Sequence, residues 1–230
     1  MSPESPSPEP STTPPLDPPH LDADAALWSD APAGRPLLVL LHGYGSDERD
    51  LFGLVPHLPP AFVFAAPRAP LTPPWPAPGY SWYPLDGLNG RDSATVTRAA
   101  ERLCAWLDEH AAGARSIGLL GFSQGAAIAL QALRLQPERF AFAVNLSGYA
   151  SAGALPGDEV LAVTKPPVFW GRGTHDDVIP EPLIAQTTAW LPEHSTLSGS
   201  VYPGLTHSVS QTELDDVTAF LEARLKQLST

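Results

Sequence analysis

A serine flanked by glycines stands near the middle of the 230-residue chain, in the sequence Gly-Phe-Ser-Gln-Gly at residues 121–125. The apolar run 117–120 precedes this motif, and an Ala-rich segment with helical spacing, 126–133, follows it. A short run that is apolar on both faces is typical of a buried strand in a parallel sheet. Ser123 is therefore predicted on a tight strand-to-helix turn, where the helix N-terminus favours negative charge beside its hydroxyl.

A serine hydroxyl becomes an effective nucleophile when a base takes its proton and a third group orients that base. Both partners follow Ser123 in the order acid, then histidine, each after a predicted strand. Asp176 and Asp177 both follow the strand predicted at 167–171, and spacing alone does not show which of them is the acid. The alternative for each is a helix-capping or surface carboxylate. His207 is the histidine downstream of these acids that follows a strand and precedes a helix; its alternative is a solvated loop histidine.

Acyl transfer also needs N–H donors aimed at the oxyanion of the tetrahedral intermediate. One predicted donor is the backbone N–H of Gln124, the residue after the serine. The second is predicted in the loop His-Gly-Tyr-Gly at 42–45, which follows a buried-strand run at 36–41. The N–H of Tyr44 is the expected donor there, and His42 is expected to shape the loop rather than to accept a proton.

The elements that must position these residues alternate between strand and helix, which predicts a parallel sheet with helices on both faces. The patterns predict further strands at 62–66, 140–146 and 200–202. They also predict a short helix from Ser46 or Asp47 through Leu54, and longer helices at 93–111, 180–191 and 210–228. Pro192 is expected to end the third of these helices, and Ser210 with Glu213 forms a capping-box pattern at the start of the last one.

Composition restricts the possible partners. The formal net charge is -12 and no basic cluster is present, which argues against nucleic acid and against an anionic membrane surface. No apolar run approaches the ~18 residues of a membrane span. The single cysteine, Cys104, lies in a helical pattern and is predicted to be a buried core thiol. One cysteine cannot form an intramolecular disulfide, which suits a reducing cytoplasm, the compartment we expect. The oligomeric state, monomer or homodimer, stays open.

The chain divides into two parts by composition. Residues 1–19 are rich in Pro, Ser, Thr and acids, which predicts a disordered tail, with a proline-rich recognition motif as the alternative. Residues 20–230 are predicted to form one catalytic domain. Within it, the Pro-, Gly- and aromatic-rich segment 67–91 is too long for a simple connection, which favours a functional loop over a loop held to the surface by its own aromatic residues.

Together these motifs resemble the phospholipase/carboxylesterase family of α/β-hydrolases, which includes the acyl-protein thioesterases. The resemblance covers about residues 36–228 and rests on four motifs in order: Leu41-His42-Gly43-Tyr44-Gly45, Gly121-Phe122-Ser123-Gln124-Gly125, Gly173-x-x-Asp176-x-x-Ile179-Pro180 and His207-Ser208. It implies an α/β-hydrolase fold with a mostly parallel central sheet, helices on both faces and no large cap domain. The family spacing of the acid between a glycine and a proline favours Asp176.

The resemblance also implies residues that bind substrate. The loop holding Trp82 and Tyr83 is similar to the segment that walls the acyl site in this family, and Leu51 ends a stretch, 45–51, that is similar to bacterial esterases in particular. The proline-rich stretch 71–79 departs from the family pattern and leaves the acyl-chain preference open.

The predicted activity is that of a serine hydrolase, a carboxylesterase acting on small esters of short to medium acyl chain through an acyl-enzyme. Ser123 is the expected nucleophile, His207 the base and Asp176 the residue that orients it. No metal or organic cofactor is implied. Two alternatives remain: a thioesterase acting on acyl-proteins or acyl-coenzyme A, and a catalytically silent binding protein of the same fold.

Overall fold

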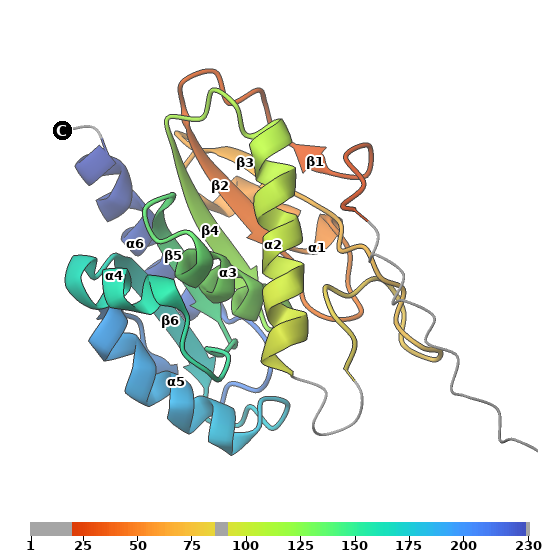
Figure 1. Cartoon of the computed structure of the whole chain (residues 1–230), viewed down its shortest axis with the longest axis vertical. Coiled ribbons are helices and arrows are strands. Elements are labelled where there is room, and N and C mark those ends of the chain that lie inside the picture. The colour runs from red at the N-terminus through yellow and green to blue at the C-terminus, as the bar shows by residue number, and fades with distance from the viewer. Residues whose placement is uncertain (1–19, 86–91, 229–230) are drawn as a thin grey trace, which may run out of the picture.

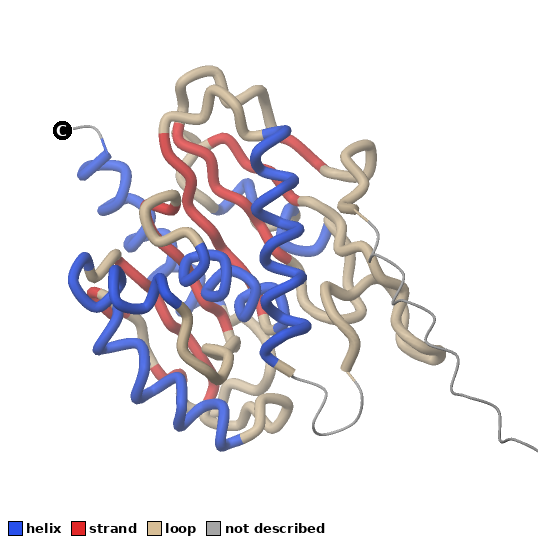
Figure 2. Tube along the Cα trace, in the orientation of Figure 1, coloured by secondary structure: helices blue, strands red, loops and turns tan. Residues whose placement is uncertain are grey.

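An eight-stranded sheet forms the centre of the molecule (Figures 1 and 2), in a computed structural model that describes residues 20–85 and 92–228. The strand order is β1-β3-β2-β4-β5-β6-β7, and β8 pairs with β6. The strands are β1 (Leu27–Trp28), β2 (Pro36–Leu41), β3 (Val63–Ala66), β4 (Ser116–Phe122), β5 (Phe140–Leu146), β6 (Pro167–Gly173), β7 (Thr196–Ser198) and β8 (Val201–Tyr202). The predicted tail, 1–19, and residues 86–91 of the predicted loop lie outside the described residues.

The sheet is mostly parallel, as predicted. All neighbouring strands run parallel except β1, which pairs antiparallel with β3. Strands β1 and β7, which have two and three residues, were not predicted. Segments this short carry no periodicity that could reveal them.

Helices cover both faces of the sheet. They are α1 (Arg49–Phe52), α2 (Ser93–His110), α3 (Gln124–Leu135), α4 (Pro156–Thr164), α5 (Glu181–His194) and α6 (Gln211–Leu228), with a 3₁₀ turn, η1 (Val55–His57). The helix predicted from Ser46 or Asp47 through Leu54 is shorter at both ends: α1 follows the N-cap Glu48 and ends at Phe52, and the chain continues into the separate turn η1. Helix α4 was not predicted.

The prediction that Pro192 ends its helix is wrong, since α5 continues to His194. A proline in the last turn sacrifices one backbone hydrogen bond without interrupting the body of the helix. Side-chain packing holds that turn: Leu191 is fully buried, and the His194 ring stacks on Trp190 with ring centroids 4.3 Å apart.

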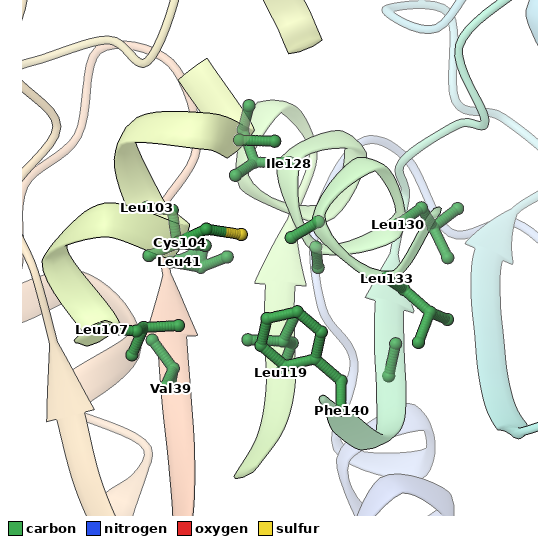
Figure 3. Close-up of a cluster of buried hydrophobic side chains, with 14 of the residues drawn as sticks. Val39, Leu41, Leu103, Cys104, Leu107, Leu119, Ile128, Leu130, Leu133 and Phe140 are labelled. Carbon is green, nitrogen blue, oxygen red and sulfur yellow. The ribbon is translucent and has the colours of Figure 1, made fainter. Parts of the chain in front are cut away.

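Two hydrophobic layers flank the sheet, as the alternation along β2 illustrates. Leu37, Val39 and Leu41 belong to the layer that contains residues of α2 and α3. Figure 3 shows Val39 and Leu41 in this layer. Leu38 and Leu40 point into the opposite layer, which α1 and α6 cover. A strand buried on both faces is rigid, so the loops that follow β2, β4, β5 and β6 at one edge of the sheet start from fixed positions.

Cys104 confirms the prediction of a core thiol. It lies on α2 among the buried side chains of Figure 3 and is 3% exposed. Burial raises the pKa of its thiol to about 11, which keeps the sulfur protonated and unreactive at neutral pH. No helix within the described ranges is long and apolar enough to cross a membrane.

Candidate active site

Ser123 occupies a strained turn between β4 and α3. Its φ of 53° and ψ of −113° are unusual for a residue with a side chain. The flanking glycines make the turn possible by close approach: a Cβ on Gly121 would lie 2.4 Å from the backbone of Gly125, and one on Gly125 would lie 2.0 Å from the carbonyl oxygen of Leu41. The turn thus holds the serine hydroxyl at the N-terminus of α3, where the sequence places it.

Two hydrogen bonds connect Ser123, His207 and Asp176. His207 Nε2 lies 2.8 Å from Ser123 Oγ, and His207 Nδ1 lies 2.8 Å from Asp176 Oδ2. Ser123 lies on the turn after β4, Asp176 in the loop after β6, and His207 in the loop before α6. Asp177, which spacing could not separate from Asp176, is exposed.

The surroundings of Asp176 favour its ionised form. Its side chain is 2% exposed, and Oδ1 accepts hydrogen bonds from the backbone N–H groups of Val178 at 3.0 Å and Ile179 at 3.3 Å. Burial alone would raise the pKa of this carboxyl, but the hydrogen bond and charge of His207, together with the two N–H groups, lower it overall. An ionised Asp176 accepts a hydrogen bond from the Nδ1–H of His207, which leaves Nε2 without a proton and able to accept the proton of Ser123.

The predicted oxyanion donors lie beside the serine. Tyr44 and Gln124 line the same pocket as Ser123 and His207. No hydrogen bond to another described residue satisfies the backbone N–H of either one. Two N–H groups from residues that line one pocket, with Gln124 at the N-terminus of α3, suit an oxyanion.

His42 fixes the loop that carries Tyr44. Its Nδ1 lies 2.8 Å from the carbonyl oxygen of Gly43, and its Nε2 lies 3.1 Å from the backbone nitrogen of Ala69. The Ala69 N–H can only donate, so Nε2 is the acceptor and Nδ1 carries the proton. Burial lowers the pKa of His42, which keeps this neutral form at physiological pH. His42 therefore shapes the loop, as the sequence predicts.

A pocket of about 160 Å³ opens beside Ser123. It is smaller than the ~300 Å³ at which sites for drug-sized ligands begin. Apolar and aromatic side chains dominate the lining, which comprises Gly43, Tyr44, Tyr83, Leu85, Phe122, Ser123, Gln124, Tyr149, Val178, Ile179 and His207.

Of the three substrate-binding residues expected from the resemblance, Tyr83 lines this pocket, while Trp82 and Leu51 do not. The Trp82 indole is fully buried and donates to the carbonyl oxygen of His42 at 2.9 Å, so it supports the loop from beneath. Leu51 packs in the core layer on the α6 side of the sheet. Trp82 lies in a loop and Leu51 in a helix of four residues, and in such irregular or short segments the spacing of residues in the sequence does not determine which side chains face a pocket.

Two polar contacts that the sequence analysis missed hold the loops around the pocket. The Gln124 side chain accepts from the backbone N–H of Trp82 at 2.8 Å and donates to the carbonyl oxygen of Tyr83 at 2.7 Å. Glu48, 2% exposed, forms two 2.6 Å hydrogen bonds with Arg68. Arg68 lowers the pKa of Glu48 to about 2, so this ion pair persists across the physiological range. Both contacts tie the segment 67–83 to the residues around the serine.

No group of three or more His, Cys, Asp or Glu side chains within residues 20–85 and 92–228 is placed to hold a metal ion.

The parallel sheet with helices on both faces, together with a serine on the strained strand-to-helix turn at its edge, defines an α/β-hydrolase. The chain belongs to the phospholipase/carboxylesterase family, whose model matches residues 23–225.

Individual relatives agree with this assignment. A probable carboxylesterase of Oryza sativa subsp. japonica is 25% identical over 224 residues, which cover 88% of this chain and 82% of the relative. Acyl-protein thioesterase 1 of Debaryomyces hansenii is 29% identical, with 72% of this chain and 77% of the relative covered. Among solved structures, esterase PE8 is similar with a TM-score of 0.70 and 31% identity, covering 86% of this chain and 98% of that chain.

Proposed function

We propose that this protein is a serine carboxylesterase in which Ser123 is the nucleophile, His207 the general base and Asp176 the residue that orients and supports the imidazolium. The observation that carries the proposal is the continuous pair of 2.8 Å hydrogen bonds from Ser123 through His207 to Asp176. These are the distances and the order of roles that nucleophilic serine catalysis requires.

Acylation begins when Ser123 Oγ attacks the ester carbonyl carbon and passes its proton to His207 Nε2. The carbonyl oxygen takes up the negative charge, and the N–H groups of Tyr44 and Gln124 donate to it. The bond from carbon to the alcohol oxygen then breaks, and the proton on His207 goes to the departing alcohol. Water, deprotonated by His207, attacks the acyl-serine, which releases the carboxylic acid and restores the Ser123 hydroxyl.

The substrate class follows from the pocket. Its lining is mainly apolar and aromatic, and no Lys or Arg among the described residues belongs to it, so the substrates we propose are small esters without a strong charge. We place the activity in residues 20–230 as one catalytic domain, with the cytoplasm as the compartment.

A thioesterase is the second candidate, and the similarity to acyl-protein thioesterase 1 of Debaryomyces hansenii supports it. The same residues would cleave a thioester by the same steps, because the thiolate leaves in place of the alkoxide. Matched substrates with the same acyl group on oxygen or on sulfur, compared by kcat/KM, distinguish the two activities.

Labelling with a fluorophosphonate probe tests the proposal. The wild-type protein is expected to react at Ser123, with the modified peptide identified by mass spectrometry. Ser123→Ala is expected to lose labelling and to lose on the order of 10⁶-fold in kcat on p-nitrophenyl acetate. If that variant keeps its turnover, Ser123 is not the nucleophile; if the wild-type protein neither labels nor turns over esters and thioesters, the silent binding protein becomes the better hypothesis.

A further inference from the structure

Two tyrosine side chains meet inside the pocket. The hydroxyl oxygens of Tyr83 and Tyr149 lie 2.6 Å apart in a buried hydrogen bond. Each residue is 1% exposed, and both line the pocket that contains Ser123 and His207. Tyr83 comes from the segment before α2 and Tyr149 from the loop after β5, so the bond joins two loops that reach the pocket from different strands.

The loop that carries Tyr149 is held firmly on both sides of the ring. The backbone N–H of Ala150 donates to Thr187 Oγ1 at 2.9 Å, and its carbonyl oxygen accepts from Gln186 Nε2 at 2.9 Å. On the other side, a Cβ on Gly148 would lie 2.4 Å from the Cβ of Ala126, which shows how closely this loop packs on α3. Tyr149 therefore has little freedom to swing out of the pocket.

Tyr83 is held by the residue next to the nucleophile. Its carbonyl oxygen accepts from Gln124 Nε2 at 2.7 Å, and the neighbouring N–H of Trp82 donates to Gln124 Oε1 at 2.8 Å. The Trp82 indole is fully buried below. Hydrogen bonds of the loop backbones hold both tyrosines, and their hydroxyls are bonded to each other. The pair is therefore a fixed boundary of the pocket and not a segment that opens and closes.

We propose that the Tyr83–Tyr149 pair is the end wall of the acyl pocket and restricts the enzyme to esters of short acyl chains. A pocket of about 160 Å³ is about half of the ~300 Å³ at which sites for drug-sized ligands begin, so the acyl groups that it accepts are small, up to about four carbons. This inference rests on the proposed function, and it narrows the short- to medium-chain range to its short end. Long fatty-acyl groups, whether on alcohols or on proteins, are excluded by the wall.

The residues around Tyr149 show what its removal would open. Tyr149 packs in a small apolar cluster with Ala127, Ile179 and Ile184. Replacing the ring by a methyl group would extend the pocket into this apolar cluster. Additional methylenes of a longer acyl chain would find an apolar surface there and be removed from water.

Two series of esters test the proposal. In the first, p-nitrophenol is the constant leaving group and the acyl chain grows from acetate through butyrate and hexanoate to decanoate. The wild-type kcat/KM is expected to fall by more than about tenfold beyond butyrate. In Tyr149→Ala the optimum is expected to move to hexanoate or longer, whereas Tyr149→Phe, which keeps the ring, is the matched control and is expected to keep the wild-type limit.

The second series keeps the acetyl group constant and lengthens the alcohol. No comparable limit is expected there, because the wall is assigned to the acyl side. A limit on the alcohol series alone, or an unchanged acyl profile in a folded Tyr149→Ala, would overturn the proposal while leaving ester hydrolysis by Ser123 intact. Failure of the wild-type protein to turn over p-nitrophenyl acetate would instead reject the proposed function itself. Fluorophosphonate labelling of each variant verifies that the nucleophile is still assembled.

Discussion

His42 Nε2 accepts a hydrogen bond from the backbone N–H of Ala69 at 3.1 Å, while His42 Nδ1 lies 2.8 Å from the carbonyl oxygen of Gly43. The Gly43 carbonyl and the Tyr44 N–H belong to one planar peptide group and point in opposite directions. By holding the carbonyl, His42 fixes the direction in which the Tyr44 N–H points. A buried histidine that bears no catalytic proton can thus position an oxyanion donor.

His42→Ala is predicted to lower kcat more than it raises KM. The Tyr44 N–H would no longer be fixed in direction, so the loss should approach, without exceeding, the ~10²–10³-fold cost of removing one oxyanion donor. Steady-state kinetics on p-nitrophenyl acetate measure the effect, with circular dichroism to verify folding. An equal rise in KM at constant kcat would mean that His42 supports substrate binding instead.

Asp176→Asn is predicted to lower kcat by on the order of 10⁴-fold while leaving KM and the fold largely intact. An amide in place of the carboxylate can donate to His207 Nδ1, which would favour the tautomer whose Nε2 carries the proton and cannot accept from Ser123. Asp177→Asn is the matched control, since Asp177 is exposed, and it should keep wild-type activity. Comparable losses in the two variants would contradict the assignment of Asp176.

The sequence located Ser123 and His207 because their neighbours are informative. A buried strand before the serine and helices after both residues determine the edge of the sheet where each must lie. Asp176 could not be separated from Asp177 by spacing, because the two differ in side-chain direction within an irregular loop. The resemblance to the family favoured Asp176, and the structure places its carboxylate 2.8 Å from His207.

Side-chain direction also explains what the sequence did not reveal. Trp82 and Leu51 have the apolar character of pocket residues, yet both turn into the core. Of the two hydrogen bonds of the capping box predicted at the start of α6, only one forms. The N–H of Glu213 donates to Ser210 Oγ at 3.1 Å, but the Glu213 carboxylate turns inward, where neither oxygen has a hydrogen-bond partner among the described residues.

Gly125→Ala is predicted to destabilise the fold by more than about 2 kcal/mol, since its Cβ would lie 2.0 Å from the backbone oxygen of Leu41. Gly113→Ala is the control: its φ of +88° disfavours a side chain, but nothing lies within 4 Å of the added Cβ. That variant should lose only about 1 kcal/mol. Urea denaturation measures both, and equal losses would mean that contact with β2 does not explain the glycine at 125.

Glu213 is predicted to make the fold less stable as the pH rises from about 4.5 to about 7. Its side chain is fully buried beneath Gly171, and burial, with a smaller contribution from Asp216, raises the pKa of its carboxyl to about 7. Between these pH values the unfolded chain releases this proton and the folded chain retains it, so ionisation favours unfolding. A shift from 4.5 to about 7 corresponds to about 3 kcal/mol, after which both states are ionised and the effect levels off.

Glu213→Gln isolates this contribution, because glutamine has nearly the same shape and does not titrate. The difference in unfolding free energy between wild type and variant, measured by urea denaturation at half-unit steps from pH 4.5 to 8, is expected to shift by about 3 kcal/mol in favour of the variant. Most of the shift should occur below pH 7. Parallel stability curves for the two proteins would show that the Glu213 carboxyl keeps an ordinary pKa, which its burial without a partner argues against.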